Sequence, residues 1–344
     1  MRRGRGWLML ALGAAIVASG VANLLLGAVE IPLAAVVDIL TGGDGVSEVW
    51  RNIVLKSRLP QTLTALVAGA GLAVSGLLMQ TVFRNPLAGP SVLGISSGAS
   101  LGVACVVLVS GIGGRALSRL GYVGDAALSL AAIVGALAVM ALIAWVSQRV
   151  RGNVTLLIIG VMIGYVANAM IGVLKFFSVE EDISAYVIWG LGSFASVSGG
   201  QVALFTAVMC VMLPLTFLLT RTLNLMLLGD RYARNLGLDV RRARLVVIAA
   251  SGVLVAVVTA YCGPIMFLGL AVPHLCRGLF ATSDHRVLIP SAMLCGAALA
   301  LLCNLIARMP GFEGVLPVNS VTALIGAPVV MWVLFRRRRS DFAE

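Results

Sequence analysis

Charged residues are scarce in this sequence. Asp, Glu, Lys and Arg together make up 11% of its 344 residues, while 60% of the residues are hydrophobic. Soluble globular proteins average about a quarter charged residues, so a soluble chain of this length would lack a sufficient polar surface. The composition therefore excludes a soluble globular protein and indicates an integral membrane protein.

The long apolar stretches also lack charged residues in their interiors. No Asp, Glu, Lys or Arg falls within the core of a candidate span, and His274, in the sequence AVPHLCR, is the one histidine there. Ion-coupled carriers normally keep such a group inside the membrane to bind the driving ion. A histidine beside a proline at a helix end is more often a hydrogen-bonded structural residue than a proton relay. The absence disfavours an ion-coupled secondary transporter, which stays a remote alternative.

Motifs that would supply energy or catalyse a reaction are missing too. The phosphate-binding pattern GxxxxGK[ST] needs a Gly-Lys pair, but the two lysines, Lys56 and Lys175, each follow a leucine. The sequence has no HExxH motif and no nucleophile elbow, and its six cysteines form no CxxC pair. We interpret the cysteines as small buried hydrophobic residues. We therefore expect no enzymatic activity, metal or cofactor in this chain, and any nucleotide hydrolysis must come from another chain.

What the sequence does contain is a series of charge-free stretches, each close to the roughly 20 residues that cross a bilayer as a helix. We expect an all-α integral membrane protein with ten transmembrane helices. The first stretch exceeds the usual length of a signal-peptide core and is interpreted as a retained span. The Ser- and Gly-rich part at 183–203 is interpreted as a re-entrant or surface segment. The candidate spans lie near 7–29, 61–83, 92–113, 126–147, 154–174, 199–220, 245–262, 264–276, 287–307 and 318–335.

The distribution of charge predicts the orientation in the membrane. With the N-terminus in the cytoplasm, 18 of the 25 basic residues lie on the inner side, and nine of the 14 acidic residues lie outside. Cytoplasmic segments carry an excess of Lys and Arg. An even number of spans then places both termini in the cytoplasm, which requires two spans within 245–280, separated at Cys262-Gly263-Pro264. The net charge of +11 is thus a topology signal and does not indicate nucleic-acid binding.

One polar segment interrupts the apolar pattern between the sixth and seventh spans. Residues 221–244, RTLNLMLLGDRYARNLGLDVRRAR, contain six arginines, and Leu225, Leu228, Tyr232 and Leu236 recur at helical spacing. This arginine-rich segment is too polar for lipid and too short for a domain. We expect it to form short amphipathic coupling helices on the cytoplasmic face, where a partner protein would bind them.

Several motifs resemble the FecCD-type permeases, the membrane subunits of ABC importers for iron complexes and cobalamin. They are SRLPQTLTALVAGAGLAVSGLLMQTVFRNPLAGPSVLGISSGASLG at 57–102, then CGPIMFLGLAVPHLCRGL, SDHRVLIPSAMLCGA and LPVNSVTALIGAPVVMWVLFRR. The resemblance extends over about residues 50–338. It implies ten helices per subunit, a second copy of the chain, two ATP-binding subunits that hold ATP and Mg, and a periplasmic substrate-binding protein. No nucleic acid is expected as a partner.

The resemblance implies that residues 1–344 form a single transmembrane permease domain in the inner membrane, surrounded by lipid, with a cytoplasmic coupling loop at about 221–244. The expected cargo is an iron complex, either a ferric siderophore or haem, driven by ATP hydrolysis on a separate subunit. Cobalamin is the alternative cargo within the same family.

The resemblance also assigns the contact with the ATPase to part of the arginine-rich segment. Residues 229–237 are similar to the family pattern GEEAAxxLG, although Asp230 and Arg231 replace the usual glutamates and Tyr232 replaces a small residue. The alternative is a basic loop without a partner. The residues expected to couple to the ATPase are Gly229, Asp230, Tyr232, Ala233, Leu236 and Gly237.

On the outer face, the resemblance implies that Arg58 of the RLP motif and Arg308 of LIARMP bind glutamates of the binding protein. Gln61 stands where the family often has another arginine, and Lys56 is a candidate replacement. Paired charges across such an interface would set orientation and association rate. The alternative is that these are solvated charges at the membrane surface.

The fifth span, 156–174, is implied to line the translocation path at the dimer axis, where a bulky cargo needs a wide passage with small side chains. Turn residues before the third and fifth spans are candidates for an inner gate, with ordinary turn and helix-cap chemistry as the alternative. The path and gate candidates are Asn85, Leu87, Asn153, Thr155, Gly160, Gly164, Asn168 and Gly172.

Overall fold

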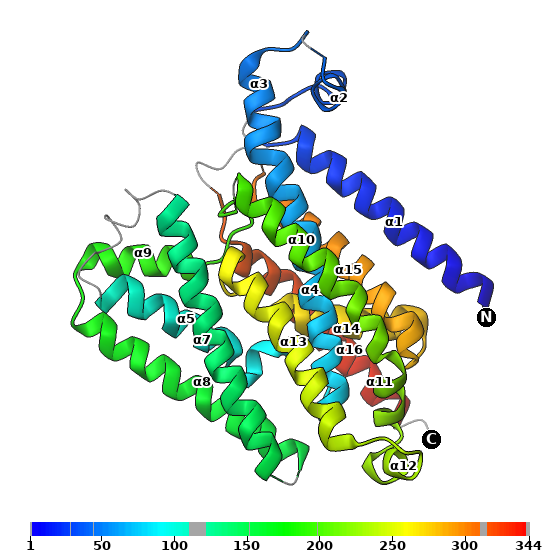
Figure 1. Cartoon of the computed structure of the whole chain (residues 1–344). Helices are drawn as coiled ribbons and strands as arrows, with labels where there is room; N and C mark the ends of the chain where they lie inside the picture. The colour runs from blue at the N-terminus through cyan, green and yellow to red at the C-terminus, as the bar shows by residue number, and fades with distance from the viewer. Residues whose placement is uncertain are drawn as a thin grey trace.

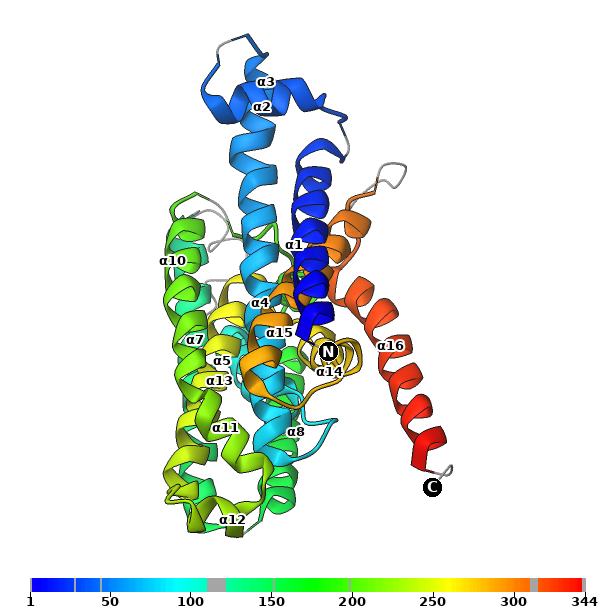
Figure 2. The same cartoon turned by 90° about the vertical axis from the view of Figure 1, so that its right-hand side faces the viewer.

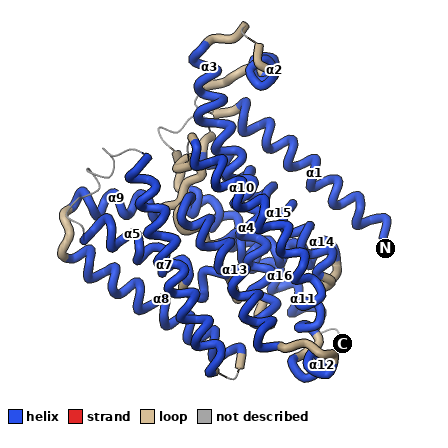
Figure 3. The backbone as a smooth tube through the Cα atoms, viewed as in Figure 1, coloured by secondary structure: helices blue, strands red, loops and turns tan. Residues whose placement is uncertain are grey.

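The regular elements of the chain are helices throughout the part that the structure describes (Figures 1 and 3). The structure is a computed structural model, and it describes the backbone of residues 2–27, 29–43, 45–109, 122–150, 152–197, 199–309 and 315–341. The long helices are α1 (Arg2–Leu25), α4 (Leu59–Phe83), α7 (Tyr122–Arg149), α8 (Asn153–Phe176), α10 (Gly200–Leu215), α13 (Val240–Cys262), α15 (His285–Ala307) and α16 (Val318–Asp341).

Shorter helices connect or extend these. The short α-helices are α2 (Leu33–Thr41), α3 (Glu48–Ile53), α5 (Ile95–Ala104), α9 (Glu180–Gly190), α11 (Thr220–Leu227), α12 (Asp230–Asn235) and α14 (Phe267–Phe280). Two π-helical turns, η1 (Val54–Arg58) and η3 (Cys105–Val109), and two 3-10 turns, η2 (Pro90–Leu93) and η4 (Thr216–Leu219), complete the set.

Seven helices in the described ranges are long and apolar enough to cross a membrane, namely Gly4–Leu25, Glu48–Phe83, Gly124–Arg149, Val154–Phe176, Gly200–Leu227, Val240–Cys262 and His285–Ala307. Three shorter apolar helices, Ile95–Val109, Phe267–Phe280 and Val318–Met331, coincide with the other three predicted spans. The chain is therefore an all-helical, multi-pass membrane protein.

The predicted interruptions lie where the sequence indicates them. α13 ends at Cys262 and α14 begins at Phe267, which separates two apolar helices around Gly263-Pro264. The Ser- and Gly-rich stretch at 183–203 is divided, because α9 ends at Gly190 and α10 begins at Gly200. The amide N–H of Ser193 donates to the carbonyl of Cys262 at 2.8 Å, so this connection packs against the break between α13 and α14.

Helix α4 forms the centre of the fold. Twenty of its 25 residues are buried, and it packs against α15, α13, α14 and α10. Gly69 of α4 and Gly296 of α15 lie back to back, since a Cβ on either one would collide with the other's carbonyl oxygen. Small residues let membrane helices approach closely. These two glycines therefore bring α4 and α15 together at backbone distance.

Helix α4 also reaches well beyond the other elements. With α3 and η1 it forms one continuous helix of 36 residues, Glu48–Phe83. At 1.5 Å per residue that is about 54 Å, compared with roughly 30 Å for the hydrocarbon core of a bilayer. Its excess length carries α3 and α2 at the end of the molecule opposite to α12 (Figures 1 and 2). There Ile31, Val36 and Ile39 form a small second hydrophobic core with Val54.

Candidate functional site

The arginine-rich segment folds into two short helices, as the sequence predicts. α11 ends at Leu227, α12 follows from Asp230 to Asn235, and α13 begins at Val240. Gly229 (φ 105°) and Gly237 (φ 84°) take the left-handed backbone conformation on either side of α12, which glycine adopts without steric cost. The segment lies at the end of the molecule remote from α2 and α3 (Figure 2).

Helix α12 directs apolar side chains away from the protein. Tyr232 is 69% exposed and Leu236 is 58% exposed, and residues four apart share one helix face. Ala233 is fully buried on the opposite side. The Tyr232 and Leu236 side chains are on a polar segment, where neighbouring apolar residues offer a small apolar area to the surroundings. Tyr232 and Leu236 are thus available for contact from outside, whereas Ala233 packs within the chain.

Asp230 is partly exposed and bridges two arginines from other parts of the chain. Its Oδ1 accepts a hydrogen bond from Arg84 at 2.5 Å, and its Oδ2 accepts one from Arg244 at 3.2 Å. Arg84 is the left-handed residue that ends α4, and its Nε also donates to the carbonyl of Met226 in α11 at 3.2 Å. Arg244 lies in the first turns of α13. One carboxylate therefore joins α12 to α4 and α13.

A second polar network joins α11 to α15 and α4. Asn224 donates through Nδ2 to Asp284 at 2.7 Å, and its Oδ1 accepts from the backbone N–H and from Nδ1 of His285. The other ring nitrogen of His285 lies 2.8 Å from the hydroxyl of Thr81 in α4. The backbone N–H of Arg286 and the Asn224 amide both lower the pKa of Asp284, because they stabilise its charged form.

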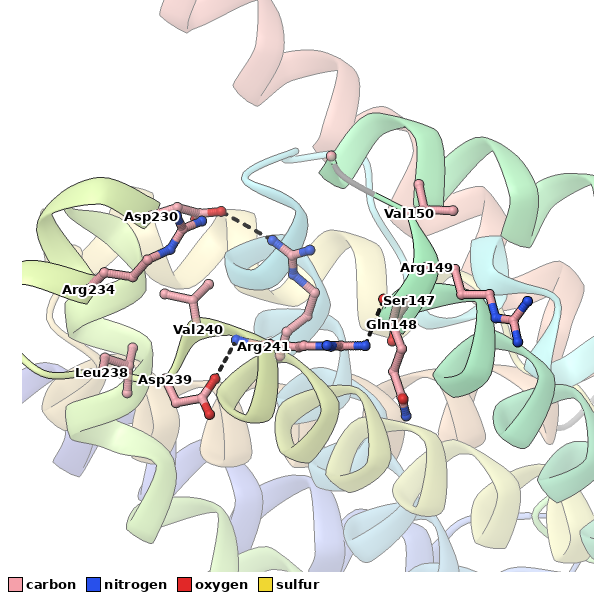
Figure 4. A pocket seen from close by; sticks show the side chains of 12 residues that line it. Ser147, Gln148, Arg149, Val150, Asp230, Arg234, Leu238, Asp239, Val240 and Arg241 are labelled. Atoms are coloured by element: carbon pink, nitrogen blue, oxygen red, sulfur yellow. Dashed lines mark hydrogen bonds and ion pairs between the residues drawn. The ribbon is translucent and has the colours of Figure 1, made fainter.

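A cavity of about 710 Å³ separates α12 and the start of α13 from the end of α7 (Figure 4). Arg241 spans it at one edge and donates to the carbonyl of Gln148 at 2.8 Å. Asp239 accepts from the N–H groups of Arg241 and Arg242 at 3.1 Å, and so caps α13. The lining residues are Ser147, Gln148, Arg149, Val150, Gly152, Asp230, Arg234, Leu238, Asp239, Val240, Arg241 and Arg244.

Arg58, a predicted docking residue, is bound within its own chain. It is 2% exposed. Its Nη1 donates to the carbonyls of Leu24 at 2.7 Å and Leu25 at 2.8 Å, and its Nη2 donates to that of Val29. The guanidinium therefore caps the C-terminal end of α1. This placement differs from both sequence interpretations, which treat Arg58 as a docking residue or as a solvated charge.

The other two docking candidates are more accessible. Lys56 is exposed, and Arg308 is partly buried at the end of α15. Burial lowers the pKa of Arg308, and the nearby Arg58 guanidinium lowers it further. Of the three docking candidates, Lys56 and Arg308 are therefore the two that a partner could reach.

The path candidates on α8 differ in burial along the length of the helix. Gly160 and Gly164 are buried, and they lie against Leu93 and Gly94 of the neighbouring η2 turn. Asn168 and Gly172 are exposed. The buried pair thus serves helix packing within the subunit, and the exposed pair remains available to line a path.

The gate candidates cluster around two turns. The Oδ1 of Asn85 accepts the N–H of Leu87 at 2.9 Å, which is the turn chemistry expected of asparagine. Leu87 and Thr155 are exposed. Asn153 is the first residue of α8, but its side chain lies outside the part of the chain that the structure describes.

His274 stabilises the turn that contains Asn85. It is 3% exposed, and its Nε2 lies 2.7 Å from the carbonyl of Pro86, to which it donates. This agrees with the interpretation of His274 as a structural residue. Sequence reasoning missed Arg84 and Arg244 as partners of Asp230, and Asn224 as the partner of Asp284, because nothing in their spacing shows these contacts.

Comparisons with known proteins agree on one class of membrane protein. The sequence profile described as the FecCD transport family matches residues 15–336. The vitamin B12 import system permease protein BtuC of Klebsiella pneumoniae is 37% identical over 98% of this chain and 96% of its own length. The BtuC protein of Escherichia coli O9:H4 is 37% identical over 92% of this chain and 94% of its own.

Two solved structures share the fold. A metal-chelate type ABC transporter in an inward-facing conformation matches with a TM-score of 0.83 and 29% identity, over 96% of this chain and 99% of the other. PsaBC from Streptococcus pneumoniae, solved in complex with a Fab, matches with a TM-score of 0.53 and 16% identity, over 88% and 95% of the two chains.

Proposed function

The chain belongs to the FecCD transport family of ABC-importer permeases, and we propose that the cargo that it moves into the cytoplasm is cobalamin. The observation that carries this proposal is the 37% identity to vitamin B12 import permeases over nearly the full length of both chains. The sequence alone places an iron complex first and cobalamin second, and the comparisons favour the reverse order.

An iron or other metal chelate is the second candidate cargo. It is supported by the 29% identity and the TM-score of 0.83 to the permease of a metal-chelate type transporter. Both candidates are bulky, mostly rigid molecules, which suits a path lined by small residues. Asn168 and Gly172, which are exposed on α8, are the path residues that we propose, with Asn85, Leu87 and Thr155 at its inner end.

Membership of an ABC-importer family makes this chain a permease subunit and not itself an enzyme. We propose that it pairs with a second copy and binds two ATPase subunits, which would hold ATP and Mg. Tyr232 and Leu236 on α12 would contact the ATPase. A periplasmic binding protein would deliver the cargo at the opposite end, close to Lys56 and Arg308.

The proposed topology has ten spans, with α12 and both termini in the cytoplasm. The seven long apolar helices and the three shorter ones support this number. The positive charge of the arginine-rich segment supports a cytoplasmic α12, and α12 lies at the opposite end from α2 and α3.

Reconstitution into liposomes with the cognate ATPase and binding protein tests the function. We expect ATP-dependent uptake of radiolabelled cyanocobalamin, and no uptake with a non-hydrolysable ATP analogue. Uptake of a ferric siderophore but not of cyanocobalamin would move the assignment to the second cargo. Uptake that needs an ion gradient and no ATPase would overturn the importer assignment.

A further inference from the structure

We infer that Asp230 is a positioning residue that ties the ATPase-contacting helix α12 to the adjacent ends of α4 and α13, so that movement of α12 is passed directly to these two helices. The inference rests on the proposed function and assigns to Asp230 a role in coupling that is separate from contact with the ATPase.

The first argument is the exposure and the partners of the side chains on α12. Tyr232 and Leu236 are well exposed, whereas the Asp230 carboxylate, which is partly exposed, binds Arg84 and Arg244 of other elements. The helix therefore has an exposed face for a partner and, in its first turn, a carboxylate that binds two other helices. A displacement of α12 by a partner on its exposed face is therefore passed to α4 and α13 through the Asp230 carboxylate.

The second argument is which elements the Asp230 carboxylate reaches. Arg84 ends α4, and it contacts both α12, through Asp230, and α11, through the carbonyl of Met226. The same end of α4 is joined to α15 through Thr81 and His285. It is also joined to α14, because Arg277 donates to Gln80 at 2.5 Å. Four neighbouring elements thus converge on the last turn of α4.

The third argument is the burial of α4 itself. Because 20 of its 25 residues are buried against α15, α13, α14 and α10, α4 cannot shift without its neighbours responding. Packed interiors transmit displacement instead of absorbing it. A small displacement at Arg84 is therefore distributed across the bundle.

Asp239 offers a matched control in the same segment. It is also an aspartate at the start of a helix, and it also contacts an arginine, since Oδ2 lies 3.1 Å from Nε of Arg242. Arg241 and Arg242, to which it binds, are however both in α13, the helix that it caps. Replacing Asp239 removes a carboxylate and a cap but leaves the link between α12 and α4 in place.

The experiment measures cyanocobalamin imported per ATP hydrolysed in liposomes that contain the full complex. Contacts between neighbouring residues do not by themselves demonstrate energetic coupling, so the coupling has to be measured. For Asp230→Asn we expect the rate of ATP hydrolysis to stay within twofold of the wild-type rate. The ratio of cyanocobalamin imported to ATP hydrolysed should be at least fivefold lower than in the wild type. Asp230→Glu should restore most of the ratio, and Asp239→Asn should leave it within twofold of the wild-type value.

Arg84→Gln provides a second test in case Asp230→Asn does not assemble. This variant keeps the pair between Asp230 and Arg244 and should also lower the ratio at least fivefold. The inference is overturned if Arg84→Gln leaves the ratio unchanged, or if Asp239→Asn lowers it as much as Asp230→Asn does. A wild-type complex that hydrolyses ATP but imports no cyanocobalamin would instead count against the proposed cargo.

Discussion

Arg58 is the clearest case of a residue whose environment decides its role. Its guanidinium is buried and donates to three carbonyls near the end of α1. A helix leaves its last carbonyls without intrahelical partners, and a cation near a helix C-terminus also interacts favourably with the helix dipole. Arg58 meets both needs at once, so we assign it to the stability of the outer end of α1.

Arg58→Ala should lower the thermal stability of the purified protein. The loss leaves three part-buried carbonyls without their donor, an effect of at most about 1–3 kcal/mol for each group. The measurement is the melting temperature in detergent, with Lys56→Ala as the control, because Lys56 is exposed. Arg58→Ala with an unchanged melting temperature and weakened binding of the periplasmic protein would instead support a docking role.

Tyr232→Ala should weaken association with the ATPase and leave the permease itself intact. Tyr232 is 69% exposed, so its removal exposes no core, and large aromatic residues at interface centres commonly contribute about 2 kcal/mol or more. Affinity can be measured by titrating the ATPase against detergent-solubilised permease. Arg231→Ala is the neighbouring exposed control. A loss of affinity with Arg231→Ala and none with Tyr232→Ala would show that charge, not the aromatic side chain, supplies the contact.

At the scale of helices, close packing between α4 and α15 depends on Gly69 and Gly296. Replacing glycine by alanine should lower stability where the glycine packs against another helix, and should not lower it where the glycine faces lipid. Gly69→Ala forces a methyl group against the Gly296 carbonyl, and overpacking of this kind costs about 1–3 kcal/mol.

Gly13 in α1 is the matched control for Gly69, because a Cβ there meets nothing within 4 Å. Gly13→Ala should be neutral or stabilising by up to about 1 kcal/mol, as expected from helix propensity. Melting temperatures of the two variants in detergent compare the effects. If Gly69→Ala matched Gly13→Ala, α4 and α15 would have to be further apart than described.

Asp284 caps α15, and its contribution should depend on pH. Asp284→Ala should cost about 0.5–2 kcal/mol through loss of the cap, while Asp284→Asn keeps a capping side chain. The pKa of Asp284 is lowered in the folded protein, so its charged form stabilises the fold above its unfolded-state pKa. That contribution disappears as the pH falls through the lowered pKa.

Melting curves of the wild type and Asp284→Asn between about pH 3 and 7 can measure this contribution, since the unperturbed pKa of aspartate is about 3.9. The difference in melting temperature between the two proteins should shrink toward the acid end. A difference that stays constant with pH would show that the carboxylate charge makes no contribution.

Much of the helix pattern could be predicted because charge and apolar length act locally along the chain. The break at Cys262-Gly263-Pro264 follows from the need for an even number of spans, and the structure has it there. The continuous helix Glu48–Phe83 is harder to predict, because Arg51, Lys56 and Arg58 interrupt its hydrophobic pattern. Arg58 could not be placed from sequence, since its burial depends on carbonyls from α1.

The candidate site shows the same division between local and tertiary information. The exposed face of α12 follows from the helical spacing of Tyr232 and Leu236. The bridge from Asp230 to Arg84 joins residues 146 positions apart, and no local pattern contains such a contact. Gly160, Gly164, Asn168 and Gly172 form a single series in sequence, but only tertiary packing separates the buried pair from the exposed pair.

At the scale of the whole molecule, the proposed ten-span topology makes a prediction about each connection. Alkaline phosphatase, which is active only outside the cytoplasm, should be active when fused after Val179, between α8 and α9. It should be inactive when fused after Gly152, between α7 and α8. A green fluorescent protein at the C-terminus should fluoresce. Phosphatase activity after Gly152 would contradict the orientation.

Because the Glu48–Phe83 helix is long, a small change in its tilt displaces its far end more than its middle. Measured from the end near Arg84, this helix is about 54 Å long. A tilt of about 3° there would shift Gly69 by about 1 Å and Glu48 by about 3 Å, from the helix rise alone. The first displacement is small enough for packed helices to accommodate, while the second moves α2 and α3 by most of a side chain's width. The same tilt thus displaces Glu48 about 2.4 times as far as Gly69, because Glu48 lies about 54 Å from Arg84 and Gly69 about 22 Å along the helix.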